Sequence, residues 1–359
     1  MIRMESYRIG IIGTGFGARV HAPMFQHHDG FEVAAIASVR GNVEAAKEQS
    51  GITNVYTDWR KMLDEESLDL VVVASAVFYH KEMVEAIFAK GIHVLCEKPM
   101  AFDSTETEDM MAARDKAEKL GLINHEFRFL PARSKIKDIL ADGRLGSLVH
   151  VRYELAHPIY KPLTSKRRGW LGRKEDGGGL LNALGSHAID SLHWWTGSTF
   201  KRLMGQLNIH APEFMDEQGN VEQRTADDAY QIIGTLNNST TVTMDLVTAA
   251  RKTDHTAKLE VYGEKGTLIM YDDQDVLVSM GDGDFEKLDL AEELEMPTGI
   301  PQAAARYYNA FKPMMDALYD TLETGHRHPT LATFENGRVT QNVIDAIRES
   351  SQEGRRITL

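Results

Sequence analysis

The sequence predicts an α/β protein in which a doubly wound parallel sheet is followed by an α+β domain with a large, open, mostly antiparallel sheet. In the first part, short apolar segments alternate with helical segments. A glycine cluster directly follows the first apolar segment. After residue 125 the apolar segments become longer and are joined by turns. Because 359 residues exceed one ordinary core, we divide the chain into domains 1–125 and 126–359.

The first domain is expected to contain six strands. The first opens "YRIGIIGTGFGA" (7–18), and the others are expected at 31–38, 54–56, 68–75, 92–96 and 121–125. Helical spacing follows from Ala18 to about Gln26 and recurs at 81–90 and 104–119. The strand at 68–75 is nearly all apolar and rich in valine, as expected for a strand buried on both faces.

Gly13, Gly15 and Ala18 fit the pattern G-x-G-x-x-[GA] of Rossmann dinucleotide-binding domains. Gly13 would make the tight turn, Gly15 would let the backbone approach a pyrophosphate, and Ala18 would allow close helix–strand packing. The amides at the start of the helix would receive the phosphates. Because the pattern follows a strand and opens a helix, it favours cofactor binding over a merely structural turn.

The end of the second strand bears on which dinucleotide is bound. NAD-selective folds usually place Asp or Glu there, whereas this chain has Ser38 and Arg40 and no carboxylate before Glu44. Ser38 could donate to a 2′-phosphate and Arg40 could pair with it, which favours NADP. The alternative is a solvated arginine in an enzyme that accepts both cofactors or prefers NAD.

Composition narrows the classes of partner. The net charge is -13, with 40 Lys plus Arg against 53 Asp plus Glu, so we expect neither nucleic acid nor an anionic membrane surface as a partner. We see no signal-peptide core and no membrane-spanning run, and Cys96 is the single cysteine, so we expect a cytoplasmic protein without disulfides. We expect no metal site, because His27–His28 and His326-x-His328 lack partners at ligand spacing.

The second domain is predicted from longer strands and flanking helices. In 241–246, Val242, Met244 and Leu246 alternate with polar residues, as in a half-buried strand. We expect residues 211–226 to form a loop and helices at 303–323 and 334–350 to close the domain. The remaining strands are expected in "LVHVRYEL", "FKRLMGQLNI", "YQIIGTL" and "KLEVYG".

The segment "GGGLLNALGSHAID" (177–190) is predicted to be a helix entered through three glycines. His187 and Asp190 lie one turn apart beside an apolar stripe. The glycines would let the backbone approach a nicotinamide or a substrate. His187 is then either a catalytic base or a satisfied core histidine.

Three motifs in this order carry a family resemblance: the glycine pattern, Glu97-Lys98-Pro99 after the fifth strand, and "GSHAID" (185–190). With "RFLP", "DGRLGSL", "DDAY" and "YGEKGTL", they make nearly the whole chain resemble the Gfo/Idh/MocA oxidoreductase family, which includes glucose–fructose oxidoreductase and inositol 2-dehydrogenase. The resemblance implies a Rossmann domain followed by an open-sheet domain, and a homodimer or homotetramer formed through that sheet.

The resemblance also implies roles for individual residues. Lys98 would lie between nicotinamide and substrate, before an often cis proline, and would orient the hydroxyl. His80 would lie on the nicotinamide side of the site or serve packing. His187 would be the base. The family's usual D-x-G-x-H here has Ala183 in place of Asp, with Asn182 beside it, which puts the hydroxyl pattern of the substrate in doubt.

The expected site has two parts. Arg168 and Trp170 are of types that hydrogen-bond to or stack on sugars, and Arg128 matches a family arginine that is either structural or near the substrate. The expected cofactor-binding residues are Gly13, Thr14, Gly15, Phe16, Gly17, Ala18, Ser38, Arg40, Ser75, His80, Glu97 and Lys98. The expected substrate-binding residues are Lys98, Arg128, Arg168, Trp170, Asn182 and His187.

The expected activity is NAD(P)-dependent oxidation of a secondary hydroxyl of a sugar, inositol or related polyol. Hydride would pass to the nicotinamide and the proton to His187, with Lys98 orienting the oxygen. Two alternatives stay open: an NAD-dependent glycosidase of the same family, and a non-catalytic regulator that binds the dinucleotide.

Overall fold

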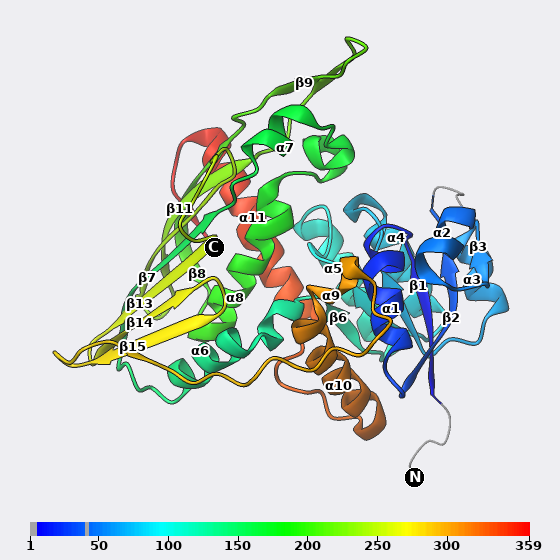
Figure 1. The fold of residues 1–359 in the computed structure, drawn as a ribbon, viewed down its shortest axis with the longest axis horizontal. Helices are drawn as coiled ribbons and strands as arrows, with labels where there is room; N and C mark the ends of the chain where they lie inside the picture. Colours follow the sequence, from blue (N-terminus) through cyan, green and yellow to red (C-terminus); the bar gives the residue numbers. More distant parts are fainter. Residues whose placement is uncertain (1–5, 40–42) are drawn as a thin grey trace. The chain divides into compact units, whose positions relative to one another are not determined.

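The structure, a computed structural model, describes residues 6–39 and 43–359, which form two compact units. The first unit runs to Phe129 and also includes Glu293–Arg338, and the second comprises Leu130–Glu292 and Val339–Leu359. Residues 293–338, expected in the second domain, thus lie with the first unit. Figure 1 shows the helices and strands of both units.

The first unit contains a six-stranded parallel sheet in the order β3-β2-β1-β4-β5-β6. This result confirms the predicted doubly wound sheet. The strand order reverses between β1 and β4, and ligands of such folds bind where the carboxyl ends of the strands flank this reversal. The strands are β1 (Tyr7–Ile12), β2 (Phe31–Ala37), β3 (Val55–Tyr56), β4 (Leu70–Val73), β5 (His93–Cys96) and β6 (Gly121–Ile123).

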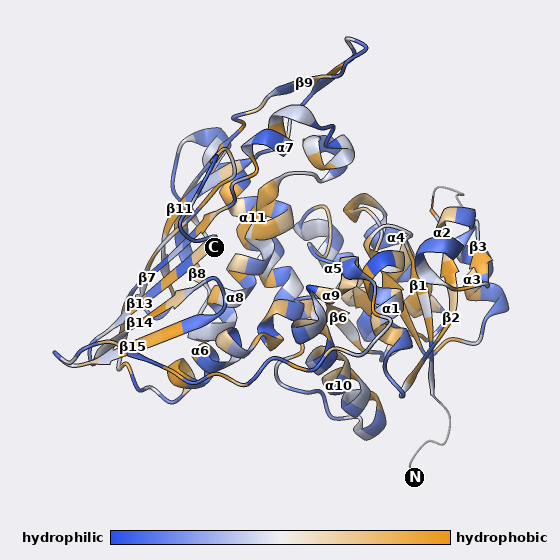
Figure 2. Ribbon diagram, in the orientation of Figure 1, coloured by the Kyte–Doolittle hydropathy of each residue, from blue (hydrophilic) through white to orange (hydrophobic). Residues whose placement is uncertain are grey.

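Helices cover both faces of this sheet. In β4, Leu70 and Val72 belong to the apolar cluster on one face, and Val71 and Val73 to the cluster on the other. Figure 2 shows the hydrophobic colouring of β1, the neighbour of β4. One cluster includes side chains of α1 (Ala22–Gln26) and α10 (Tyr308–Thr324), and the other those of α3 (Trp59–Glu65), α4 (His80–Ala89) and α5 (Ser104–Ala117).

The placement of α10 differs from the expected one. Its side chains Phe311, Met314 and Leu318 pack in the same cluster as Ile9 and Phe25 of the first unit. The amphipathic pattern of 303–323 predicted a helix with one buried face, but such a pattern does not specify which apolar surface the helix covers. A short helix, α9 (Gln302–Ala305), precedes α10, and α2 (Val43–Ser50) follows β2.

The second unit contains a nine-stranded sheet in the order β16-β15-β14-β13-β7-β12-β11-β8-β17. Only the β7–β12 pairing is parallel among the pairings described for this sheet, so the predicted mostly antiparallel sheet is confirmed. The strands are β7 (Leu148–Ala156), β8 (Phe200–Asn208), β11 (Ala229–Leu236), β12 (Thr241–Val247), β13 (Ala257–Gly263), β14 (Gly266–Tyr271), β15 (Asp275–Met280), β16 (Glu286–Lys287) and β17 (Ile357–Thr358).

Three helices contribute to the apolar core beneath this sheet. Ile136 of α6, Leu192 of α8 and Ile347 of α11 lie in one cluster with Tyr153 and Met244 of the sheet. The helices are α6 (Pro131–Ala141), α8 (Ser186–Thr196) and α11 (Phe334–Glu353), of which α11 belongs to the second unit from Val339.

The prediction that residues 211–226 form a loop is wrong, because they include a hairpin of β9 (Glu213–Met215) and β10 (Val221–Gln223). Its turn is organised by Asp216, whose Oδ1 accepts the Asn220 N–H at 2.8 Å. Strands this short and exposed carry too little apolar alternation to be recognised in the sequence.

No helix in the described ranges 6–39 and 43–359 combines the length and the apolar character needed to cross a membrane.

Candidate functional site

The glycine loop after β1 is shaped by close contact with the loop after β4. Gly13 has φ +125°, and a Cβ added there would lie 2.2 Å from the Ala74 carbonyl oxygen. Only glycine fits such a position. A Cβ added at Gly15 would meet no heavy atom within 4 Å. The loop is therefore pinned at Gly13 and open at Gly15, as a phosphate cradle requires.

Close packing of the following helix depends on Gly17 more than on Ala18, which was expected to provide it. A Cβ added at Gly17 would lie 2.9 Å from Ile11 Cγ2 and 3.2 Å from Ala74 Cβ. Ala18 is fully buried. The first turn, η1 (Gly17–His21), is a π-helix, a wide turn that is frequent at functional sites. Its open, glycine-lined start fits a dinucleotide pyrophosphate.

The two residues expected to select the cofactor differ in what the structure describes. Ser38 is only 1% exposed, and its backbone N–H donates to the Tyr56 carbonyl at 2.8 Å. Arg40 lies outside the described residues. The choice between NAD and NADP therefore stays a prediction.

Lys98 follows β5 and precedes a cis proline, and a buried polar network surrounds this turn. The Glu97 carboxylate accepts hydrogen bonds from Asn124 Nδ2 (2.7 Å) and from the backbone N–H of Lys98 (3.2 Å). His21 Nε2 lies 2.7 Å from Glu97 Oε1. The network thus joins the end of η1, which carries His21, to the ends of two strands, because Glu97 directly follows β5 and Asn124 directly follows β6.

Glu97 is ionised in this network. Burial by itself raises the pKa of the carboxyl, but the His21 hydrogen bond and charge, the Lys98 charge and the Asn124 hydrogen bond together lower the pKa below its usual value. The carboxylate therefore keeps a negative charge beside Lys98 while holding its backbone. The sequence analysis missed His21 and Asn124, because neither carries a signal until the strand ends are brought together.

His80 is buried and contacts the protein through both nitrogens of its ring. Its Nδ1 lies 3.2 Å from the Met100 carbonyl and its Nε2 lies 3.2 Å from the Ser75 carbonyl. Burial lowers the pKa of the ring. Since both nitrogens face backbone carbonyls, His80 ties the turn after β5 to the loop after β4, which supports the packing alternative.

Other expected residues of the first unit occupy supporting positions. The Phe16 ring lies edge-on to His21, with centroids 5.4 Å apart, and to Tyr307 at 5.2 Å. Thr14 lies inside the glycine loop and is half-buried. Arg128 is buried, and its Nη1 donates to the Thr330 carbonyl at 3.3 Å.

In the second unit, the helix expected over 177–190 is not a regular α-helix. It begins as a π-helix, η6 (Leu181–Gly185), in which the Ser186 N–H donates to the Leu181 carbonyl, and continues as α8. The regular spacing that puts Ala183 one turn before His187 does not hold through this wide turn. His187 is 6% exposed and Asp190 is 2% exposed.

The glycines before this helix lie in close contact with other parts of the protein. A Cβ added at Gly178 would lie 2.5 Å from the carbonyl oxygens of Leu171 and Trp170, and one added at Gly179 would lie 2.2 Å from Asp227 Oδ1. Their small size is thus needed for packing of the loop that carries Trp170 and for the approach of Asp227.

Asn182 and Asp227 hold the start of this helix. Asn182 Nδ2 donates to the Gly177 carbonyl at 2.8 Å, and its Oδ1 accepts from Arg348 Nη2 at 2.9 Å. Asp227 accepts the Leu181 N–H at 2.7 Å. Burial raises the pKa of Asp227, although this hydrogen bond opposes the shift. Both side chains thus hold the segment that leads to His187, and the predicted contact of Asn182 with substrate stays a prediction.

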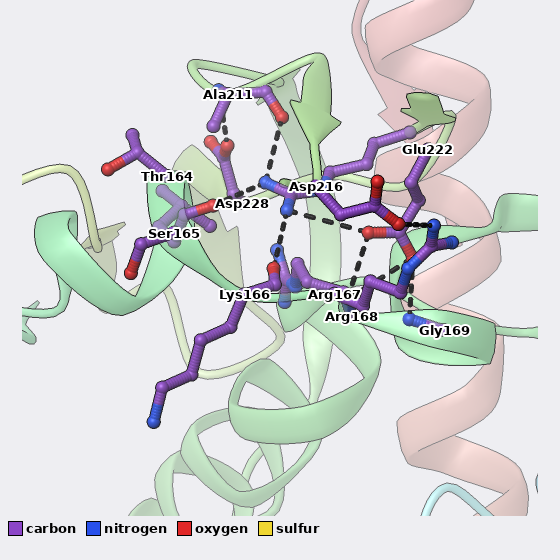
Figure 3. Close-up of polar contacts among 12 residues, drawn as sticks. Thr164, Ser165, Lys166, Arg167, Arg168, Gly169, Ala211, Asp216, Glu222 and Asp228 are labelled. Atoms are coloured by element: carbon purple, nitrogen blue, oxygen red, sulfur yellow. Dashed lines mark hydrogen bonds and ion pairs between the residues drawn. The ribbon is translucent and has the colours of Figure 1, made fainter. Parts of the chain in front are cut away.

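Arg168 and Trp170 lie on a loop fastened to the β9–β10 hairpin (Figure 3). The Glu222 carboxylate accepts the N–H of Arg168 at 3.0 Å and that of Gly169 at 2.7 Å. Trp170 lies in the short helix η4 (Gly169–Gly172) and is 38% exposed. The structure thus brings Arg168, Trp170 and the glycines before His187 into one region of the second unit.

The two units contribute different types of functional group. The first presents a glycine cradle and an anchored lysine at the carboxyl edge of a parallel sheet, and the second presents a histidine near a cationic, aromatic loop. No group of three or more His, Cys, Asp and Glu side chains suited to a metal was found within residues 6–39 and 43–359. This fold and glycine loop are those of a Rossmann dinucleotide-binding domain.

Comparison with known proteins gives the family. Residues 7–125 match the oxidoreductase family described as having an NAD-binding Rossmann fold, and residues 134–269 match the GFO/IDH/MocA C-terminal domain. The chain is an NAD-binding oxidoreductase of the Gfo/Idh/MocA family.

Relatives extend over most of the chain. An uncharacterized oxidoreductase, sll0816, of Synechocystis sp. is 31% identical over 76% of this chain and 74% of its own length. Myo-inositol 2-dehydrogenase of Thermotoga maritima is 22% identical over 98% of both chains. The solved structure of a levoglucosan dehydrogenase with NADH and L-sorbose has a TM-score of 0.86 at 19% identity over 98% of both chains, which supports the fold.

The two glycines of the loop should respond differently to alanine. Gly13→Ala should lower the melting temperature of the protein without cofactor, because φ +125° and the Ala74 carbonyl exclude a Cβ. Gly15→Ala has room for its methyl group, so its melting temperature should be near that of the parent, while its affinity for NADH should fall about tenfold or more. Calorimetric melting and NADH titration check both; unchanged NADH affinity in Gly15→Ala would contradict the cradle.

Proposed function

We propose that this protein oxidises a secondary hydroxyl of a sugar, inositol or related polyol, reversibly and with a nicotinamide dinucleotide. The observation that carries the proposal is the buried network of His21, Glu97 and Asn124, which holds the Lys98 turn at the same sheet edge as the glycine cradle. Burying an ionised group in such a network costs free energy. The network is useful because it holds one side chain in an accurate orientation.

The roles of the residues follow from their chemistry. The residues of 13–18 would hold the pyrophosphate, and the bound nicotinamide supplies the hydride acceptor. Lys98 donates a hydrogen bond to the reacting oxygen and stabilises negative charge that develops there. His187 accepts the hydroxyl proton as a general base. Asp227 and Asn182 hold the start of the helix that carries His187.

The substrate class is supported by relatives. Those whose names state a substrate include dehydrogenases of myo-inositol and of D-apiose, and a levoglucosan dehydrogenase has the same fold. All three names describe oxidation of a polyhydroxylated ring compound or sugar. The exposed Trp170 and the half-buried Arg168 on the same loop suit such ligands.

Two further properties belong to the proposal. We expect a homodimer or homotetramer formed through the open sheet, whose strands expose Met204 at 42% and Ile233 at 57%. We also place the protein in the cytoplasm, in keeping with its single, buried cysteine, Cys96.

The function is tested by a panel of sugars and inositols, with NAD and NADP separately, followed by absorbance at 340 nm. Net cofactor reduction with a polyol is expected. Cleavage of glycosides without net cofactor reduction would favour the NAD-dependent glycosidase, and tight dinucleotide binding without turnover would favour the regulator. The expected preference for NADP rests on Ser38 and Arg40, and a tenfold or larger preference for NAD in kcat/KM would overturn it.

Replacing Lys98 should affect chemistry more than cofactor binding. Lys98→Ala should reduce kcat about 100-fold or more, because the hydrogen bond to the reacting oxygen is lost. NADH affinity, measured by fluorescence titration, should change little. Lys90→Ala is the matched control, since Lys90 is exposed and pairs with Asp64 at 2.6 Å. Near-normal turnover in Lys98→Ala would remove this lysine from the mechanism.

His187 should control the pH dependence of oxidation. If it is the base, kcat/KM rises with pH as the imidazole loses its proton, and His187→Ala should abolish this limb and reduce kcat/KM about 100-fold. His150→Ala is the control, because His150 lies on β7 and contacts Thr241 at 2.8 Å. A lower melting temperature with an unchanged pH profile would instead identify His187 as a core residue.

A further inference from the structure

The segment around Arg168 has a charge opposite to that of the chain as a whole. The protein carries a net charge of -13, yet residues 157–176 include six Lys and Arg against two carboxylates. The cations are Lys161, Lys166, Arg167, Arg168, Arg173 and Lys174. Two of these cations are paired within the protein, Arg167 with Asp216 and Arg173 with Glu175 and Asp176.

The β9–β10 hairpin fixes the backbone of this segment. Glu222 accepts the N–H groups of Arg168 and Gly169, as described above, and Arg224 donates through Nη1 and Nη2 to the carbonyls of Leu163 (2.5 Å) and Lys166 (2.9 Å). Figure 3 shows the contacts of Glu222 with Arg168 and Gly169. The position of Arg168 is therefore set by contacts of the main chain.

The acidic groups around Arg168 are engaged with other donors. Asp216 Oδ2 pairs with Arg167 Nη2 at 2.6 Å. Asp228 accepts the N–H groups of His210 at 2.8 Å and Ala211 at 2.9 Å. Glu222 and Asp227 accept backbone N–H groups. Within the described residues, no hydrogen bond or ion pair joins the guanidinium of Arg168 to any of these carboxylates.

The lack of a contact with these carboxylates is energetically unfavourable for the Arg168 guanidinium. The side chain is half-buried, and its burial together with the nearby Arg224 charge lowers the pKa of the guanidinium, although Asp228, Asp227 and Glu222 oppose the shift. A partly desolvated guanidinium without a partner is destabilised relative to one with a carboxylate. Its planar group binds a carboxylate through two parallel hydrogen bonds.

The loop that carries Arg168 is hydrogen-bonded to the segment that leads into the helix of His187. The Gly179 N–H donates to the Leu171 carbonyl and the Gly178 N–H donates to the Arg173 carbonyl, both at 2.9 Å. A ligand group held by Arg168 thus binds to a loop that is hydrogen-bonded to the segment leading into His187.

We propose that the substrate carries a carboxylate and that the Arg168 guanidinium binds it, so that the substrate is a sugar acid rather than a neutral sugar. This inference rests on the proposed function and narrows its substrate class. A carboxylate fits better than a phosphate, because a dianion would lie close to the charges of Asp227, Asp228 and Glu222 while gaining one guanidinium.

The experiment compares acids with their neutral counterparts. Two pairs are compared: D-glucuronate with D-glucose, and D-galacturonate with D-galactose. For each compound we measure kcat/KM, and we measure its affinity for the NADH-loaded protein by calorimetry. We expect at least one acid to exceed its neutral partner about tenfold or more in affinity. Arg168→Gln should lower the affinity of the acid about 10-fold to 100-fold and that of the neutral sugar less than threefold.

Arg167→Gln is the matched control. It removes the same charge from the neighbouring residue, whose guanidinium is paired with Asp216, and should leave the ratio of acid to neutral affinity unchanged. The inference is overturned if neither acid binds more tightly than its neutral partner, or if Arg168→Gln weakens acid and neutral sugar equally. It is also overturned if glucose 6-phosphate binds more tightly than glucuronate through Arg168.

Measuring the affinity for the acids and their oxidation separately distinguishes a failure of this inference from a failure of the proposed function. Arg168-dependent binding of an acid that is never oxidised would support the carboxylate site and count against the dehydrogenase. Oxidation of neutral sugars without preference for acids would support the dehydrogenase and reject the carboxylate site.

Discussion

The contact between Gly13 and the Ala74 carbonyl is the constraint on which the N-terminal unit depends. Strands β1 and β4 are neighbours in the sheet, and their loops leave the same edge at the point where the strand order reverses. The approach of the two backbones leaves no space for a side chain at position 13, whereas position 15 is open. A dinucleotide cradle therefore results from two loops that pack against each other, with glycine required for a different reason at each position.

The same edge contains a buried carboxylate, Glu97. His21, at the end of the wide turn that begins at Gly17, contacts the carboxylate that holds the Lys98 backbone. The end of η1 and the Lys98 turn are thus joined through the Glu97 carboxylate. A buried carboxylate contributes little to stability on average, so the value of Glu97 here lies in fixing the backbone at Lys98.

Two carboxylates of the second unit accept backbone N–H groups at the segments expected to form the site. Asp227 holds the start of the π-helix before His187, and Glu222 holds the turn at Arg168. Of the neighbouring arginines, Arg224 lies 3.6 Å from Glu222 and Arg167 pairs with Asp216. The unit can therefore present a guanidinium near several acids without forming an ion pair with any of them, which is the basis of the carboxylate site inferred for Arg168.

The sequence alone determined the alternating strands and helices, the open second sheet and the glycine loop, because apolar periodicity and the demands on Gly13 are local. The family motifs identified Lys98 and His187, whose catalytic roles stay predictions. Tertiary structure decided which surface α10 covers, that His80 faces two backbone carbonyls, and that Gly178 and Gly179 lie against backbone carbonyls and Asp227. These outcomes depend on which groups, distant in the sequence, lie opposite one another in the fold. The local sequence of a single helix or turn does not specify which element packs against it.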